Sequence, residues 1–333
     1  MAVSLSALAL AIVILVSLSL GKYPLSMSEI LGFFQYRLYG GGTLDGERLR
    51  LLENIILGIR LPLILAAAMI GAALSVSGSA YQAMFINPLV SPSLLGVLAG
   101  ASFGAALGMV YFKSWAAVQL ATFLGGFAAV GIAAGIARIY RVNSNIMLVL
   151  GGIISGALFT SLLSMVKYLA DPNNQLPAIV YWLMGNMAMA DRTVVIRGGV
   201  PICAGILVLV LMARHLNVLS MGDEEARALG VNVTLVRMTV ITCATLISTI
   251  TVVMAGIIGW VGLIIPHITR MITGPDNETL IPASALLGAA YLVVVDDVSR
   301  LMFSYEIPIG VVTALVGIPF FALVLGNARK GWS

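Results

Sequence analysis

Long stretches without a single charged residue constrain this chain more than any other feature. A helix that crosses the hydrocarbon core of a bilayer needs about 20 consecutive apolar residues. The charge-free stretches are 2–20, 61–112, 114–137, 142–166, 198–213, 238–266, 279–295 and 307–328. The mean hydropathy is +1.06, and only 10% of the residues are charged, which is too little to cover a soluble protein. The sequence therefore predicts an all-α, polytopic membrane protein.

The stretch 61–112 is too long for one crossing. It contains an Asn-Pro and a Ser-Pro pair between residues 87 and 92, and both pairs are typical of turns. One span is therefore expected near 57–81 and another near 93–111. Ser91 is expected to cap the second helix, with Pro92 as its first residue.

The run that starts at Met238 is also too long for one crossing, and glycines and a proline interrupt its second half. We expect a span that ends near residue 256, followed by a short helix near 258–272. The total is then ten spans, or nine if the short helix only dips into the membrane. The segment 172–190 has the composition of a loop, with a short interfacial helix expected around Trp182.

The N-terminus, the basic residues and the cysteines exclude several classes. The first twenty residues lack the basic region of a cleaved signal peptide, so we expect a retained first span. The basic residues are scattered, which argues against a nucleic-acid partner, and their distribution does not decide which loops face inward. Cys203 and Cys243 lie in apolar runs without a CxxC motif, so neither a disulfide framework nor a zinc site is expected.

All fourteen carboxylates fall outside the predicted spans or at their edges. An ion-gradient-driven secondary transporter usually keeps an ionisable group near the middle of the membrane, so this alternative is disfavoured but stays open. No G-x-x-x-x-G-K-[ST] loop occurs, so the chain is not itself expected to hydrolyse ATP. His215 and His267 have no second ligand at a useful spacing. No intramembrane enzyme, metal site or cofactor is therefore expected.

The loop 214–237 carries the most informative polar string, MGDEEARALGV. Asp223 is expected to cap a short helix, Glu224 and Glu225 suit its first turn, and Gly230 suits its end. A helix of about seven residues is unstable alone, so the protein body or a partner must hold it. From the residues alone, a capped surface loop and a docking element are equally good interpretations.

Small residues recur at helical spacing in several spans. Examples are Gly100, Gly104 and Gly108, then Gly131 and Gly135, and then Gly152, Gly156, Thr160 and Ser164. Close packing between helices is the favoured interpretation, and a pathway lined by small polar groups is the alternative.

An ordered series of strings resembles the FecCD family of permeases. The strings are RLP at 60–62, GAALSVSGSAYQ at 71–82, NPLVSPSLLGVLAGA at 87–101, WLMGN at 182–186, EEARALGV at 224–231, GWVGLIIPHITR at 259–270, LIPASALLGAA at 280–290, DDVSR at 296–300 and PIGVVTALVGIPFF at 308–321. They cover the chain from about residue 57 to its end, in family order.

The resemblance implies one permease domain over residues 1–333, with ten helices, cytoplasmic termini and a place in the bacterial inner membrane. It implies a homodimer around a central pathway, two cytoplasmic ATP-binding subunits, and a periplasmic or lipid-anchored substrate-binding protein on the outer side. Membrane lipid surrounds such a permease. The substrates that it implies are metal chelates, haem and corrinoids, and some relatives carry oxyanions.

The resemblance also assigns residues. The loop 214–237 matches the family's ATPase-coupling loop, in which the coupling residues would be Gly222, Asp223, Glu224, Glu225, Ala226, Arg227, Ala228, Leu229 and Gly230. The fifth and tenth spans resemble the pathway-lining helices, which would use Gly152, Gly156, Thr160, Ser164, Gly310, Ala314 and Gly317.

Arg60 and Arg300 match the family's arginines that receive the binding protein at the outer face. The match is incomplete, because Leu63 stands where the family often has a second arginine. Two alternatives remain open. Both arginines could snorkel to lipid headgroups, or Asp296 could hold Arg300 internally, four residues away on one helical face.

Overall fold

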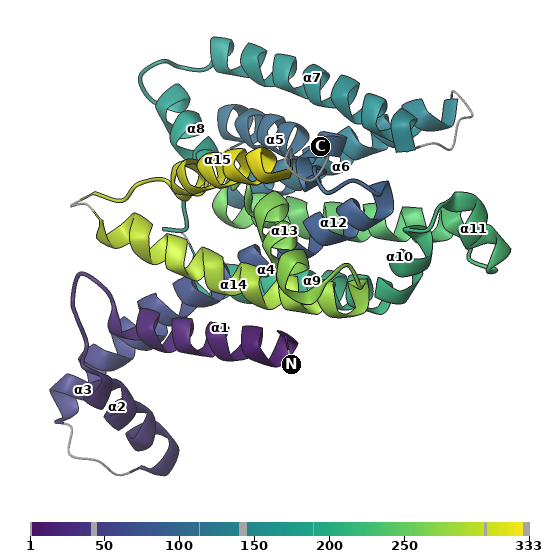
Figure 1. Cartoon of the computed structure of the whole chain (residues 1–333). Helices are drawn as coiled ribbons and strands as arrows, with labels where there is room; N and C mark the ends of the chain where they lie inside the picture. The colour runs from purple at the N-terminus through teal and green to yellow at the C-terminus, as the bar shows by residue number, and fades with distance from the viewer. Residues whose placement is uncertain are drawn as a thin grey trace.

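The computed structural model describes residues 2–40, 45–112, 114–139, 145–188, 190–302 and 305–328. Within these residues the chain is a bundle of helices, and no β-strand occurs among them (Figure 1). This confirms the predicted all-α membrane fold.

Ten helices of the described chain are apolar enough to lie within a membrane. Seven are long enough to cross it: α1 (Ala2–Ser19), the continuous helix Gly46–Phe85, α6 (Trp115–Ile139), α7 (Asn145–Leu169), α9 (Arg192–Leu211), α12 (Val233–Ala255) and α14 (Asn277–Leu301). Three shorter ones complete the set: α5 (Val97–Tyr111), α13 (Val261–Thr273) and α15 (Ile309–Ala328). Seven and three make ten apolar helices, and α13, with 13 residues, is the short helix expected near 258–272, whose crossing of the membrane decides between ten spans and nine.

Six short elements join or flank these helices. They are α2 (Met27–Tyr39), α3 (Gly46–Glu53), the 3₁₀ turn η2 (Pro92–Leu95), α8 (Gln175–Leu183), α10 (Ala213–Leu219) and α11 (Asp223–Ala228). The helix α8 is the one expected around Trp182, and α11 is the one expected in the loop 214–237. Nothing in the sequence analysis predicted α2 and α3.

The second span begins earlier than expected. The helix α3 continues without a break through the π-helical turn η1 (Asn54–Arg60) into α4 (Leu61–Phe85). Pro62 has no N–H group, and its ring would clash with the carbonyl group four residues earlier in a regular α-helix. The wider turn relieves this clash, since Leu61 donates to the Ile56 carbonyl five residues back. The proline is therefore accommodated by a widened turn inside a longer helix, close to residue 57, where the span was expected to start.

The start of α5 also differs from the prediction. Pro92 opens the 3₁₀ turn η2, and Ser91 precedes it without a capping hydrogen bond from its side chain. Gly96 then adopts a left-handed conformation, with φ at 80°, and α5 begins at Val97. A residue without a Cβ atom adopts this φ at little cost, so the chain can redirect between the two helices.

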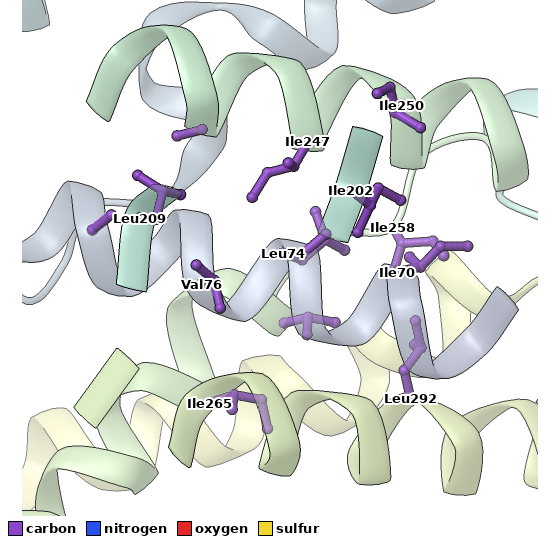
Figure 2. Close-up of a cluster of buried hydrophobic side chains, with 14 of the residues drawn as sticks. Ile70, Leu74, Val76, Ile202, Leu209, Ile247, Ile250, Ile258, Ile265 and Leu292 are labelled. Carbon is purple, nitrogen blue, oxygen red and sulfur yellow. The ribbon is translucent and has the colours of Figure 1, made fainter. Parts of the chain in front are cut away.

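The helix α4 lies at the centre of the bundle and packs against α9, α12, α13 and α14. Figure 2 shows α4 residues such as Ile70 and Leu74 meeting isoleucines of α9 and α12. The backbones approach closely at glycines: a Cβ atom on Gly71 would lie 2.1 Å from the Gly288 carbonyl oxygen, and one on Gly78 would lie 1.9 Å from that of Gly262. Small residues thus set the packing of the central helix.

The glycines predicted to pack in α5 and α6 differ in whether they contact another helix. Gly100 and Gly104 of α5 face α6, where added Cβ atoms would lie 2.2 and 2.1 Å from carbonyl oxygens. Cβ atoms on Gly131 and Gly135 would meet nothing within 4 Å. The packing interpretation is confirmed for the first pair, and the second pair contributes no packing within this chain.

Two groups of short helices mark opposite ends of the bundle. In Figure 1, α10 and α11 project at one end, whereas α2, α3 and α8 lie at the other. The helix α1 borders one long side of the bundle, and α7 forms the side opposite to it.

Candidate functional site

The helices α10 and α11 form a compact segment at one end of the bundle, which we call the coupling segment (213–230). Its buried side chains include Leu216, Leu219 and Ala226, all 0% exposed. Gly222 makes the turn between the two helices with φ at 124°, a conformation that L side chains rarely adopt. The segment thus has a packed inner side despite its short helices.

The structure corrects the role expected for Asp223. The N-cap position of α11 is Gly222, with no capping side chain, and Asp223 is the first helical residue. The Asp223 carboxylate instead accepts a hydrogen bond from Arg237 of α12 at 2.7 Å. Arg237 is only 8% exposed, and a buried guanidinium requires a charged partner more than a helix end requires a cap. Glu224, Glu225 and Gly230 take the predicted positions in the first turn and after the last.

Two further contacts fix the coupling segment to other helices. The Asn217 side chain donates to the Asp276 carboxylate at 2.7 Å and accepts from the Asn277 backbone at 2.8 Å, at the start of α14. The Ser220 hydroxyl lies 3.4 Å from the Ala83 carbonyl oxygen, at the end of α4. The segment therefore contacts α4, α12 and α14, three helices that run through the bundle.

The coupling segment also exposes apolar side chains. Met221 and Leu229 are 63% and 62% exposed, and the charged residues Glu224 and Arg227 of the same segment are exposed as well. Two exposed apolar side chains on a segment whose other side is packed form a surface that a partner groove can bind. Force applied there would reach α4, α12 and α14.

Arg60 lies at the other end of the bundle and does not reach the surface. It is 5% exposed, and its guanidinium donates to the backbone carbonyls of Leu18 and Tyr23. The structure therefore does not support Arg60 as a docking residue. Its bonds tie the end of α1 and the following loop to the widened turn η1, and the continuous helix places it inside the fold.

Arg300 is held internally, as the alternative interpretation allowed. Its Nε donates to Asp296 and its Nη2 to Asp297, each at 2.8 Å. Ser17 of α1 also donates to Asp297, at 2.9 Å. The Arg300 side chain keeps 16% of its surface exposed, and a cavity of about 40 Å³ beside it is also lined by Glu306. We call Arg60, Asp296, Asp297 and Arg300 the outer charge cluster.

The two carboxylates of this cluster lie deeper than predicted. They were expected at the edge of a span, but α14 continues to Leu301 and buries Asp296 and Asp297 to 1% and 7% exposure. Pairing with a cation explains this, because a buried carboxylate without a partner would be very costly.

The small residues assigned to the pathway in α7 divide into two groups. Gly152 and Gly156 face η2 and the turn after it, and a Cβ atom on Gly152 would lie 2.2 Å from the Leu94 carbonyl oxygen. The missing side chain of Gly152 thus admits the backbone of the same chain, and its role in a pathway stays a prediction. Thr160 and Ser164 are exposed, and each donates its hydroxyl to a carbonyl group of its own helix.

The glycines assigned to the pathway in α15 also pack within the chain. A Cβ atom on Gly310 would lie 2.5 Å from the Met184 carbonyl oxygen, and one on Gly317 would lie 2.8 Å from Trp260. These contacts explain why both positions lack a side chain, and a role of the two glycines in a pathway stays a prediction. Ala314 is half-buried, and the exposed side of α15 is apolar, with Leu315 68% exposed.

A comparison with protein-family models matches residues 9–327 to the FecCD transport family. The chain belongs to this family. The match confirms the resemblance predicted from the ordered strings, and it extends beyond them to include α1.

Relatives with assigned names share the family and most of the chain. The molybdate import system permease protein MolB of Haemophilus influenzae is 36% identical over 324 residues, which are 97% of this chain and 95% of that protein. The hemin transport system permease protein HmuU of Yersinia pestis is 33% identical over 286 residues, which are 83% and 84% of the two chains. The cobalamin import system permease protein BtuC of Halobacterium salinarum is 36% identical over 275 residues, covering 82% and 73%.

A solved structure has the same fold over almost its whole length. It is described as a metal-chelate type ABC transporter in an inward-facing conformation, and it matches with a TM-score of 0.87 and 34% identity over 98% of both chains. The structure of PsaBC from Streptococcus pneumoniae matches with a TM-score of 0.57 and 18% identity, covering 88% of this chain and 94% of that one, a likeness of fold alone.

Sequence reasoning missed the residues that hold the coupling segment of this FecCD-family chain. Arg237 lies fourteen residues after Asp223, and Asn217 lies about sixty residues before its partners. No helical spacing links residues so far apart, so only the folded chain reveals these pairs. A weak signal was available for Arg237, since a cation directly before a charge-free span needs a partner at the membrane edge.

Proposed function

We propose that this chain is the membrane-spanning permease subunit of a binding-protein-dependent ABC importer in a bacterial inner membrane. The membership in the FecCD transport family over residues 9–327 carries this proposal. The likeness to an ABC transporter over 98% of both chains supports it. The coupling segment supplies the mechanical element that such a subunit needs, because its energy must come from ATP hydrolysis on another chain.

In this proposal, the coupling segment lies on the cytoplasmic side and docks on one of two ATP-binding subunits. Met221 and Leu229 enter a groove of that subunit, and the residues from Gly222 to Gly230 form the contact. The hydrogen bonds of Asp223, Asn217 and Ser220 then carry a movement of the ATPase to α12, α14 and α4. Three attachments make the segment move with these helices rather than bend independently.

A second copy of the chain is proposed to complete the transport pathway. The exposed sides of α7 and α15 are apolar, with Ile153, Leu158 and Leu315 at 58%, 44% and 68% exposure. Within this surface, Thr160 and Ser164 supply the small polar groups on α7, and Ala314 supplies a small position on α15. A homodimer that pairs these sides would enclose a pathway between its two copies.

The outer end is proposed to receive a periplasmic or lipid-anchored substrate-binding protein. Arg300 is the contact in this proposal, since its guanidinium is partly exposed beside Glu306. A carboxylate on the binding protein could share Arg300 with Asp296 and Asp297. Arg60 takes a structural role instead, because both of its bonded nitrogens already donate to backbone carbonyls.

The proposed substrate is a metal chelate, haem, a corrinoid or an oxyanion. The named relatives carry molybdate, hemin and cobalamin, so the family is compatible with each class. The binding protein would select the substrate first, and the permease would admit what that protein delivers.

The experiment that tests this proposal is uptake into proteoliposomes. The permease would be reconstituted with its ATP-binding subunit and its binding protein, with a radiolabelled substrate that the binding protein retains. Uptake that requires both partners and ATP is the expected result. Uptake by the permease alone, driven by a proton or sodium gradient, would contradict it and favour a secondary transporter.

A further inference from the structure

The helix α2 has a wider apolar surface than the protein covers. Ile30 and Phe33 point into the bundle and are 1% and 3% exposed. Met27, Leu31 and Leu38 follow one adjacent stripe of the same helix at a spacing of four and seven residues, and they are 41%, 61% and 74% exposed. One part of the apolar surface is therefore packed, and no described residue of the chain covers the other part.

The polar groups of α2 are turned away from this stripe and are already paired. Glu29 accepts a hydrogen bond from Arg48 of α3, and Arg48 donates to the Tyr23 hydroxyl at 2.6 Å. Ser26 and Glu29 also form a capping box at the start of the helix. With its charges bound to α3, the exposed stripe presents apolar surface without the free charges of a typical polar docking site.

The position of α2 relates this stripe to the membrane. Only seven residues separate the end of α1 at Ser19 from the start of α2 at Met27. In Figure 1, α2 lies beyond that end of α1, at the edge of the bundle opposite α7. The exposed side of α1 is itself apolar, with Leu8 and Ile12 at 57% and 52% exposure, as expected for a span that faces lipid. The stripe therefore continues a lipid-facing surface.

A groove between α1 and α14 reaches the same level. It has a volume of about 610 Å³, and its lining is apolar apart from Asp297. The lining includes Val16 of α1, Leu20 directly after α1 and Met302 directly after α14. These residues precede the α2–α3 hairpin or lie beside the outer charge cluster. An apolar groove beside the exposed side of α1 is a surface that acyl chains can fill.

We propose that α2 is an in-plane helix of the outer membrane interface, with Met27, Leu31 and Leu38 inserted among the acyl chains of the outer leaflet. Amphipathic helices of this kind bury their apolar side about 5–10 Å into the boundary between headgroups and chains. The partner is the bilayer, and α3 covers the opposite side of the helix. The widened turn η1 and Arg60 then connect a helix held at a fixed depth to the central helix α4.

The test measures the depth of two positions on α2. Leu31→Cys and Tyr36→Cys are prepared in a Cys203→Ala/Cys243→Ala background and labelled with an environment-sensitive fluorophore. The two positions are five residues apart, which turns them about 140° from each other around the helix. Tyr36 is 40% exposed, so both sites accept a label at the surface. The permease is reconstituted in lipid nanodiscs with phosphatidylcholine brominated on its acyl chains.

The expected result is that brominated lipid quenches the label at position 31 severalfold more than the label at position 36. Aqueous iodide should show the reverse order. Equal access of iodide to both positions would overturn the proposal. Protection of position 31 from both quenchers would also overturn it, because a second copy or another protein would then cover the stripe.

Two controls keep the result interpretable. Leu38→Cys lies on the same stripe and gives an independent reading if Leu31→Cys alters the fold, which thermal unfolding of each labelled variant would reveal. Adding the purified binding protein should leave the quenching unchanged. Loss of iodide or lipid access only after that addition would assign the stripe to the binding protein and contradict the proposal. The outcome is independent of the ABC function, since it requires neither ATP nor substrate.

Discussion

The two ends of the bundle use charged residues in opposite ways. At the inner end, Asp223 and Arg237 fix the coupling segment, and the apolar side chains of Met221 and Leu229 remain exposed. At the outer end, Arg300 is the residue expected to meet a partner, but Asp296 and Asp297 already bind it. The coupling segment thus exposes apolar side chains, whereas the outer charge cluster exposes part of an arginine that two carboxylates of the same chain already bind.

This difference shows that a family motif identifies a residue but does not reveal whether that residue is free to bind a partner or is already bound within its own chain. At the coupling segment, Asp223 and Arg237 bind each other, and the exposed apolar side chains of Met221 and Leu229 take no part in this ion pair. At the outer end, a partner must compete with two internal carboxylates, so docking there would also change how α14 binds α1 through Ser17. The two ends should therefore respond differently to the same kind of substitution.

The largest effect should come from a substitution in α4, the central helix that connects both ends of the bundle. Gly78→Val places a side chain where a Cβ atom already lies 1.9 Å from the Gly262 carbonyl oxygen. We expect α4 and α13 to separate, with a loss of about 3 kcal/mol or more in the free energy of unfolding. Gly131→Val is the matched control, because its Cβ atom meets nothing within 4 Å. Thermal unfolding in detergent that is equal for the two variants would contradict the packing described for α4.

Removing one carboxylate at each end should separate stability from coupling. Asp297→Ala leaves a largely buried cluster with excess positive charge and should cost about 2–3 kcal/mol. Asp223→Ala removes the carboxylate bound to Arg237, whose side chain is only 9% exposed, and should also cost about 2 kcal/mol. The two variants should therefore lose similar stability, but ATP-driven uptake per ATP hydrolysed should fall more in Asp223→Ala. An equal fall in uptake per ATP in both variants would remove the distinction between the two ends.

Arg→Lys substitutions should distinguish the docking role proposed for Arg300 from the structural role proposed for Arg60. Lysine keeps the charge but loses the planar fork that binds two carboxylates at once. We expect Arg300→Lys to weaken binding of the cognate binding protein by about tenfold, the value of one charged hydrogen bond. Arg60→Lys should leave this affinity unchanged and lower the melting temperature instead. An equal loss of affinity in both variants would return Arg60 to the interface.

The smallest effect should be a pH dependence in the α2–α3 hairpin. The hydrogen bond from Arg48, together with those from Ser26, lowers the pKa of Glu29 from 4.5 to about 2. A lowered pKa stabilises the hairpin at any pH above the ordinary value, and the stabilisation is lost as the pH falls from 4.5 toward about 2.

Spin labels at Gln35 and Glu47, both exposed, would report this change as a wider distribution of the distance between α2 and α3. Glu29→Gln should show the wide distribution already at neutral pH. A distribution in the parent protein that stays narrow down to pH 2 would show that this ion pair does not hold the hairpin.

Most of the fold could be predicted from the sequence, because a membrane span is a local property. Ten apolar helices follow from apolar length and from turn-forming pairs, and the orientation is a prediction from the family strings alone. The errors lie where a local signal had two meanings: the second span was expected to start near residue 57, but the helix starts at Gly46 and Pro62 follows a widened turn inside it. The helix α2 was missed because its exposed apolar stripe is short and interrupted by polar residues.

The candidate sites were harder to predict, because their state depends on contacts between distant residues. The coupling string was recognised from its sequence, but its attachment through Arg237 and Asn217 was not. Arg60 was assigned to the outer face from its match to the family, whereas its partners, Leu18 at the end of α1 and Tyr23 after it, lie some forty residues earlier in the chain. Glycines at helical spacing similarly do not reveal whether they face the same chain or a pathway.

The most direct test of the central claim is a substitution on the exposed side of the coupling segment. Leu229→Glu places a charge at the proposed ATPase contact, and Leu235→Glu makes the same change at a position on α12 that is 63% exposed, against 62% for Leu229. Both variants would be reconstituted with the ATP-binding subunit and the binding protein, and substrate uptake and ATP hydrolysis would be measured together. The account predicts that uptake per ATP hydrolysed is lost in Leu229→Glu and retained in Leu235→Glu, with both proteins folded. Normal ATP-driven uptake in a folded Leu229→Glu permease would contradict it.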